Sequence, residues 1–120
     1  MDDALDYLGT SDQLGKLPLQ DLREGKVTLP LLATLKRCSV AEREMIISVL
    51  KSLAQGRSDV DHGDVGRVAE GVARYQGAEF TLERARQRAT AARRKIETFA
   101  VCKARDALLD LTEFVVQRQN

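Results

Sequence analysis

Residues 2 to 30 read DDALDYLGTSDQLGKLPLQDLREGKVTLP, a stretch in which acidic residues, glycines and lysines follow one another closely. It opens on three aspartates, and each of two later lysines directly follows a glycine; these residues are Asp2, Asp3, Asp6, Lys16 and Lys26. Carboxylates bind hard cations such as Mg²⁺, which often bridge to substrate phosphates. Lysine supplies a compact positive charge for the same phosphate oxygens. The grouping is therefore typical of a site for a metal ion and a diphosphate.

The spacing of the aspartates suits a helix. Asp2 and Asp6 would lie on one helical face, a turn apart, and Asp3 about 100° round, at the edge of that face. By itself this pattern also fits an acidic first turn favoured by the helix dipole. The two lysines, taken singly, also fit solvated loop residues. The combination of aspartates and glycine-lysine pairs in one stretch favours the metal and diphosphate interpretation.

The same stretch resembles the second aspartate-rich region of the trans-isoprenyl diphosphate synthases, also called polyprenyl synthetases. That family carries DDxxD, then GTS-x-x-LGK, then a loop similar to DLREGKxTLP that leads into the next helix. The three pieces stand here in that order, at residues 2–6, 9–16 and 21–30. Weaker similarity continues through residues 72–89 and 104–118, so the resemblance covers nearly the whole chain.

The resemblance implies an all-α helical bundle that is part of the isoprenoid synthase fold. It also implies a prenyltransferase, a polyprenyl diphosphate synthase that uses Mg²⁺ to condense isopentenyl diphosphate with an allylic diphosphate. By family position, Asp2 is the principal metal ligand, supported by Asp3 and Asp6. Lys16 and Lys26 hold the diphosphate of the allylic substrate. No separate catalytic residue is assigned, and the product length, which the family sets upstream, is not indicated here.

The length of the chain limits these expectations. The family's catalytic chain is much longer than 120 residues, and no first aspartate-rich motif precedes Met1. We therefore expect one helical domain, residues 1–120, that is the C-terminal portion of a synthase and is inactive alone. The alternative is a catalytically inactive helical interaction module derived from such a synthase, which would act by associating with a partner or with itself.

Composition narrows the class of protein further. Hydrophobic residues make up 43% and charged residues 31%, as in ordinary soluble domains. The net charge of +1 creates no global field for nucleic acid or membranes. The chain has no apolar run long enough for a transmembrane segment and no signal pattern, so we expect a cytoplasmic location. Cys38 and Cys102 lack metal-type spacing and are expected to be reduced, and buried or half-buried.

Every periodic segment is helical. Apolar periodicity and end signals predict helices over about residues 2–8, 29–37, 40–55 and 64–76, a loop over 9–28 and a polar turn over 57–63. Thr28 is expected to cap the second helix, Ser39 and Glu42 to form a capping box, and Gly77 to close the fourth. Beyond it, a break near residues 101–103 separates two periodic segments, although one bent helix is an alternative.

Several apolar stripes follow from this helical reading. The main ones are Leu31, Leu32 and Leu35; Ile46, Val49, Leu50 and Leu53; Ala85, Ala89, Ala92, Ile96 and Phe99; and Ala104, Leu108, Leu111 and Val115. In a chain without the rest of a synthase, we expect the first two stripes to lack partners. A homo-oligomer would then bury them.

Two further features are interpreted as surface. His62, the only histidine, fits a turn between Asp61 and Asp64 better than a catalytic role. The basic run over residues 84–95 could indicate RNA binding, but no aromatic residues are interleaved with it and glutamates flank it. We expect that run to be a solvated helix face and expect no nucleic-acid partner.

Overall fold

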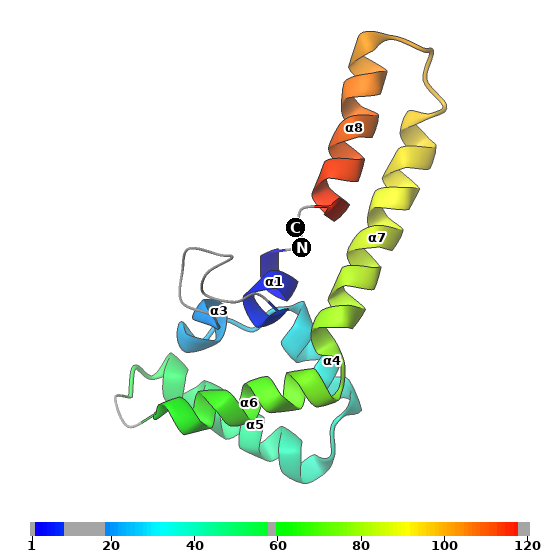
Figure 1. Ribbon diagram of the computed structural model, residues 1–120. Coiled ribbons are helices and arrows are strands. Elements are labelled where there is room, and N and C mark those ends of the chain that lie inside the picture. Colours follow the sequence, from blue (N-terminus) through cyan, green and yellow to red (C-terminus); the bar gives the residue numbers. More distant parts are fainter. Residues whose placement is uncertain (1, 9–18, 58–59, 118–120) are drawn as a thin grey trace. The chain divides into compact units, whose positions relative to one another are not determined.

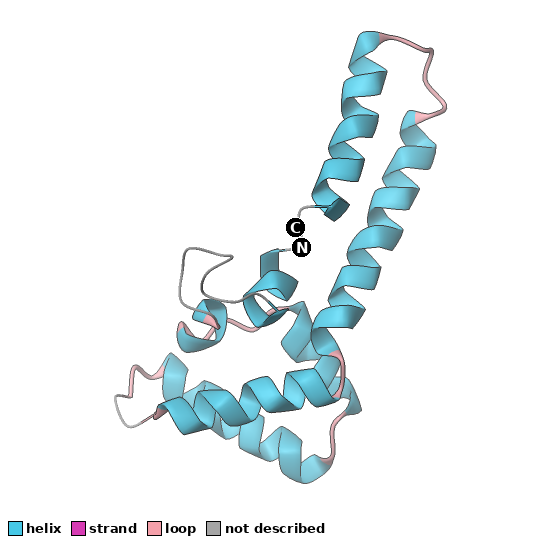
Figure 2. Ribbon diagram, viewed as in Figure 1, coloured by secondary structure: helices cyan, strands magenta, loops and turns pink. Residues whose placement is uncertain are grey.

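The computed structural model describes residues 2–8, 19–57 and 60–117. These residues form helices and no strand, which confirms the all-α prediction (Figure 2). The chain divides into two compact units, the motif unit (residues 2–81) and the hairpin unit (from residue 82 onward). Each unit is described by itself, so the expectation of a single domain over residues 1–120 stays a prediction.

The motif unit is built around one apolar core. Its described helices are α1 (Asp2–Leu8), α3 (Gln20–Arg23), α4 (Leu29–Arg37), α5 (Val40–Ala54), α6 (His62–Arg74) and the start of α7 (Gly77–Ile96) (Figure 1). The core cluster consists of Leu22, Leu31, Ile46, Val49, Val65, Val68 and Val72. Tyr7 of α1 packs against this cluster, so the helix that carries the aspartates is attached to the core.

Local sequence signals set the starts of two helices, α5 and α6. Ser39 and Glu42 form the predicted capping box at the start of α5. The side chain of Asp61 accepts the N–H of Asp64 at 2.8 Å, so α6 begins at His62, slightly earlier than predicted. Thr28 precedes α4 as expected, but its side chain makes no capping hydrogen bond.

The connections differ from the prediction in two places. The short helix α3 lies inside the segment predicted to be loop. Gly77 does not merely end α6, because it is the first residue of α7. A Cβ atom at Gly77 would overlap the carbonyl oxygen of Pro30 and lie 2.6 Å from Thr34 Oγ1. Helix α7 therefore begins in close contact with α4, at a position that only glycine fits.

The expectation that the α4 and α5 stripes lack partners is wrong. Leu31 and Ile46 are fully buried and Val49 is 8% exposed, because α6 packs against both α4 and α5. Leu32 is the exception on α4, since it is 45% exposed. The stripes thus find most of their partners inside the motif unit.

The hairpin unit consists of the rest of α7 and of α8 (Lys103–Gln117), joined by residues 97–102 (Figure 1). The alternative of one bent helix is therefore wrong. On α7 the predicted small-residue face, Ala85, Ala89, Ala92 and Ile96, is half-buried, whereas Phe99 lies in the connection and is exposed. Arg93 Nη1 bonds Glu113 Oε1 at 2.6 Å and links the two helices.

The half-buried face of helix α8 is rotated by about 100°, one residue, from the face that was predicted. Its half-buried side is formed by Arg105, Leu109, Thr112 and Val116. Leu108, Leu111 and Val115 of the predicted apolar face are exposed, and no residue of α8 is buried. The periodicity of the helix was read correctly, but the face that meets α7 is the more polar one.

Two other expectations have outcomes here. Both cysteines are free, but only Cys38 is buried, so the expectation that Cys102 is buried or half-buried is wrong. Within the described ranges, no helix combines the length and the apolar character that a membrane crossing requires.

Candidate functional site

The three predicted metal ligands lie on α1 but differ in their surroundings. Asp2 is exposed, Asp3 is half-buried and Asp6 is only 8% exposed. Their helical spacing is as predicted, but Asp2 and Asp6 do not present equally open carboxylates. Across residues 2–8, 19–57 and 60–117, no three side chains of His, Cys, Asp or Glu are grouped closely enough to hold a metal ion.

Asp6 ties α1 to the loop that follows it. Its two carboxylate oxygens accept the backbone N–H groups of Gln20 and Asp21, each at 3.0 Å. Its carbonyl oxygen accepts the N–H of Leu19 at 3.1 Å. These bonds satisfy donors at the start of α3 and explain why a helix forms within the predicted loop. They use two of the roughly four acceptor positions of the carboxylate.

The loop after α3 holds Lys26 among carboxylates. Gly25 turns the chain with a φ of 74°, and the N–H of Lys26 donates to the carbonyl of Asp21 at 2.9 Å. Lys26 Nζ lies 2.7 Å from Glu24 Oε2 and 3.8 Å from Asp21 Oδ1. The Lys26 side chain is 59% exposed, so solvent screens these ion pairs and an incoming anion can reach the ammonium.

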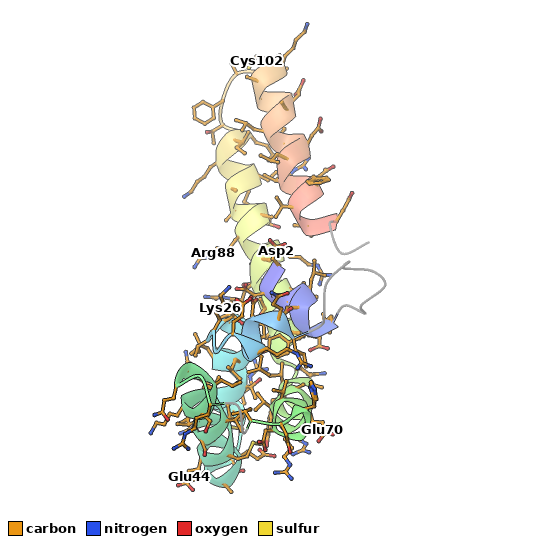
Figure 3. All side chains as sticks on the ribbon, turned by 90° about the vertical axis from the view of Figure 1, so that its left-hand side faces the viewer. Asp2, Lys26, Glu44, Glu70, Arg88 and Cys102 are labelled. Carbon is orange, nitrogen blue, oxygen red and sulfur yellow. The ribbon has the colours of Figure 1, made fainter. Side chains whose placement is uncertain are left out.

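A carboxylate of α1 also contributes to the electrostatic surroundings of Lys26. The pKa of Lys26 is raised above its ordinary value, first by the hydrogen bond and charge of Glu24 and then by the carboxylates of Asp21 and Asp3. Asp3 belongs to α1, which packs against both α3 and α4. Figure 3 shows α1, with Asp2 labelled, and the loop of Lys26 at the same end of the motif unit. The fold therefore brings the predicted metal-binding helix and one predicted diphosphate-binding lysine together.

Tyr7 lies near the same acidic residues. The sequence analysis did not identify it as part of the site. It lies four residues after Asp3, on the same face of α1. Its hydroxyl is buried and has no hydrogen-bond partner among the described atoms. Burial raises the pKa of Tyr7 far above its ordinary value, and Asp6, Asp21 and Asp3 add to the effect. Its position directly after Asp6, one turn from Asp3, was the available signal.

The two remaining residues considered in the sequence are Lys16 and His62. Lys16 lies outside the described residues. His62 is exposed, as predicted, but its Nδ1 lies 3.1 Å from Nη1 of Arg23. This contact joins the end of α3 to the start of α6, and it gives His62 a role in packing rather than in chemistry.

The donors of the site suit a hard cation and a phosphate. Asp2, Asp3 and Asp6 offer carboxylate oxygens, the ligand type that Mg²⁺ takes in proteins. Lys26 offers an ammonium whose three donors can turn toward phosphate oxygens. The residues present therefore fit a metal-diphosphate ligand in their chemistry, with Asp6 the most constrained of the three carboxylates.

Comparisons with known proteins show the family of this chain. The family model described as polyprenyl synthetase matches residues 1–63, which include α1, α3, α4 and α5. The chain is 33% identical over 122 residues to a short chain isoprenyl diphosphate synthase of Methanothermobacter thermautotrophicus, and the match covers 99% of this chain and 34% of the relative. No solved structure matches the chain.

Two further relatives differ in the product that their names give. The octaprenyl diphosphate synthase of Escherichia coli is 32% identical over 98% of this chain and 35% of its own length. The geranylgeranyl diphosphate synthase of Saccharolobus solfataricus is 27% identical over 99% of this chain and 35% of its own length. The chain thus spans about a third of the length of these relatives. The family match and the order of its motifs agree, and the chain belongs to the polyprenyl synthetase family.

Proposed function

We propose that this chain provides the second metal- and diphosphate-binding region of a Mg²⁺-dependent prenyltransferase. The reaction is the condensation of isopentenyl diphosphate with an allylic diphosphate to give a polyprenyl diphosphate. The observation that supports the proposal is that α1, which carries the three aspartates, packs against α3 and α4, the two helices that flank the loop of Lys26. We therefore propose that the aspartates of α1 and Lys26 bind parts of the same metal-diphosphate ligand.

Each residue has a distinct task in this proposal. Asp2, Asp3 and Asp6 would hold Mg²⁺, which when bound neutralises the charge of the departing diphosphate. Asp6 also fixes the loop of Lys26 relative to α1 through its bonds to Gln20 and Asp21. Lys26 binds the diphosphate, and Lys16 is proposed to do the same.

Without a ligand, the ammonium of Lys26 is occupied by ion pairs with its neighbours. Its ammonium is paired with Glu24 and Asp21, both on the same loop. An allylic diphosphate offers more oxygen acceptors than either carboxylate, and more negative charge before it binds a metal ion, so we expect the lysine to exchange these partners for phosphate oxygens. Because the lysine side chain is 59% exposed, that exchange needs only rotation of the side chain.

A binding experiment tests the site directly. Calorimetry would follow inorganic diphosphate binding to the full chain with and without Mg²⁺. We expect weak, metal-dependent binding that falls about tenfold in Lys26→Ala and in the double variant Asp2→Asn with Asp3→Asn. Lys51→Ala removes an exposed lysine of α5 and is the matched control. Binding that the site variants reduce no more than Lys51→Ala does would overturn the proposal.

A second experiment tests the reaction. The chain would be mixed with the part of the Methanothermobacter relative that it does not match, and product would be measured by incorporation of labelled isopentenyl diphosphate. We expect turnover only when both parts are present, with Lys26→Ala raising the allylic KM and Asp2→Ala lowering kcat. Turnover that survives Asp2→Ala and Lys26→Ala unchanged would assign the chemistry to other residues.

A second candidate function is a catalytically inactive interaction module, which one observation favours. The exposed apolar face of α8, with Leu108, Leu111 and Val115, has no cover within the hairpin unit. In this candidate the face pairs with a second copy of the chain. Sedimentation across a dilution series tests it: a dimer that Leu108→Ser with Leu111→Ser dissociates supports it, and a monomer at every concentration refutes it.

A further inference from the structure

The connection between α7 and α8 exposes apolar side chains in an unusual concentration. Phe99 is 69% exposed and Val101 is 79% exposed, the highest value among the large apolar residues described. Ala100 and Cys102 beside them are also exposed. Single exposed apolar residues are common on protein surfaces. Four in succession at the turn of a hairpin, here called the hairpin tip (residues 97–103), call for a partner.

The same end of the hairpin is strongly basic. Five basic and two acidic side chains lie between Arg93 and Asp106, a local net charge of +3 in a chain whose total is +1. Glu97, one of the two acids, is paired with Arg93 at 3.1 Å. Arg94, Lys95 and Lys103 are exposed on either side of the apolar residues. The net charge of the whole chain is therefore close to zero although this end of the hairpin is positively charged.

We propose that the hairpin tip docks on the surface of an anionic lipid bilayer. Phe99 and Val101 would enter the headgroup region, while Arg94, Lys95 and Lys103 contact the negatively charged lipids. An exposed apolar group ringed by cations is the combination that peripheral membrane segments use, because apolar burial and charge attraction add. The long stems of lysine and arginine let their charges reach the headgroups while Phe99 lies deeper.

Charge also separates the tip from the exposed face of α8. Along α8, the acidic residues Asp106, Asp110 and Glu113 stand beside the apolar face, and a negatively charged bilayer would repel them. The α8 face therefore suits a protein partner, whereas the tip suits the lipid. Figure 3 labels Cys102 at this end of the hairpin. The inference concerns the hairpin unit alone and does not depend on the proposed function of the motif unit.

Vesicle co-sedimentation of the full chain tests the inference. The vesicles are pure phosphatidylcholine, or phosphatidylcholine with about one third phosphatidylglycerol. We expect binding to the anionic vesicles only, with the bound-to-free ratio lowered about tenfold by Phe99→Ser with Val101→Ser and by Arg94→Glu with Lys95→Glu. Val40→Ser, at an apolar site that is 70% exposed on α5, and Lys51→Glu are the matched controls, each expected to change the ratio less than about twofold.

A second measurement reports on Phe99 itself. The chain has no tryptophan, so Phe99→Trp introduces a single probe. Its emission should shift to the blue on addition of anionic vesicles and stay unchanged with neutral ones. Vesicle binding that depends on Arg94 and Lys95 but not on Phe99 and Val101, accompanied by equal binding to RNA, would overturn the inference in favour of a general anion surface. A blue shift that depends on protein concentration without vesicles would overturn it in favour of a second copy.

Discussion

The motif unit and the hairpin unit are both helical, but different interactions hold them together. In the motif unit, side chains from α3, α4, α5 and α6 form a buried apolar cluster. In the hairpin unit, α8 has no buried residue; its contacting side is only half-buried, and the Arg93–Glu113 pair links it to α7. A fully buried Leu or Ile contributes about 1.5–3 kcal/mol, whereas an ion pair between exposed groups contributes about 0–1 kcal/mol. Most of the stability of the chain therefore lies in the motif unit.

The periodicity of apolar residues does not by itself reveal whether a helical face is covered by another part of the protein. The stripes of α4 and of α8 look alike in the sequence. Leu31 is fully buried, whereas Leu111 is 55% exposed. Helix α1 and the described residues from Leu19 onward pack on the core of the motif unit, whereas the hairpin leaves its tip and its α8 face exposed.

The largest expected effect contrasts the two units directly. Ile46→Ala removes a fully buried side chain from the core cluster and should lower the free energy of unfolding by about 2–5 kcal/mol. Leu111→Ala, on the exposed face of α8, should change it by less than about 0.5 kcal/mol. Urea denaturation, monitored by circular dichroism, measures the free energy of unfolding of both variants. Equal losses would mean that the α8 face is covered in solution, and the comparison would fail.

The next effect concerns the point where α7 begins. A Cβ at Gly77 would overlap the backbone carbonyl of Pro30, so Gly77→Ala forces α7 and α4 apart and should cost about 3 kcal/mol. Gly66 in α6 has no atom within 4 Å of an added Cβ, so Gly66→Ala should stabilise the chain by about 0.5–1 kcal/mol. Thermal melts of the two variants should shift in opposite directions. A neutral Gly77→Ala would show that α7 can separate from α4 without loss.

Much of the motif unit could be predicted from the sequence because its signals are local. The capping box at Ser39 and Glu42 and the Asp61 cap act within a few residues, and the structure contains both. The early start of α7 at Gly77 and the exposed face of α8 depend on contacts between distant residues. Nothing local distinguishes Leu108 from Leu109, so the face that meets α7 could not be predicted.

In the candidate site, too, features that depend on local sequence could be predicted, and features that depend on distant contacts could not. The glycine-lysine context of Lys26 predicted a diphosphate-binding residue but not its ion pairs; the pairing with Glu24 follows from the tight turn at Gly25. The role of Asp6 as an acceptor for Gln20 and Asp21 was missed, because it depends on how the chain returns to α1. The buried hydroxyl of Tyr7 was missed for the same reason.

A third prediction concerns how much the hydrogen bonds between Asp6 of α1 and the start of α3 contribute to stability. Asp6→Asn replaces one of the two acceptor oxygens by an amide and removes the charge, so it should cost about 1.5 kcal/mol. Asp110→Asn, at an exposed position of α8, should cost less than about 0.5 kcal/mol. Amide hydrogen exchange at Gln20 and Asp21 should accelerate only in the Asp6 variant. Unchanged exchange there would mean that α3 is held by other contacts.

The smallest expected effect is a pH dependence confined to the motif unit. The pKa of Glu42 is lowered, first by the hydrogen bond from the Tyr75 hydroxyl and further by the Ser39 N–H and by Arg74. A carboxyl whose pKa is lower in the folded chain binds fewer protons there than in the unfolded chain. Its stabilising effect is therefore present above the ordinary carboxyl pKa of about 4.3 and is lost as the pH falls through the lowered value.

Glu42→Gln removes this dependence because the amide does not titrate. The thermal midpoint of the parent chain should fall more steeply between about pH 5 and about pH 3 than that of Glu42→Gln, and the two should be closest at the acid end. Glu70→Gln, at an exposed position of α6, is the matched control and should follow the parent chain. Glu42 joins the start of α5 to the end of α6 through Arg74 and Tyr75, so this dependence reports on the motif unit and not on the hairpin. An identical pH profile for Glu42→Gln and the parent chain would mean that these contacts do not persist in solution.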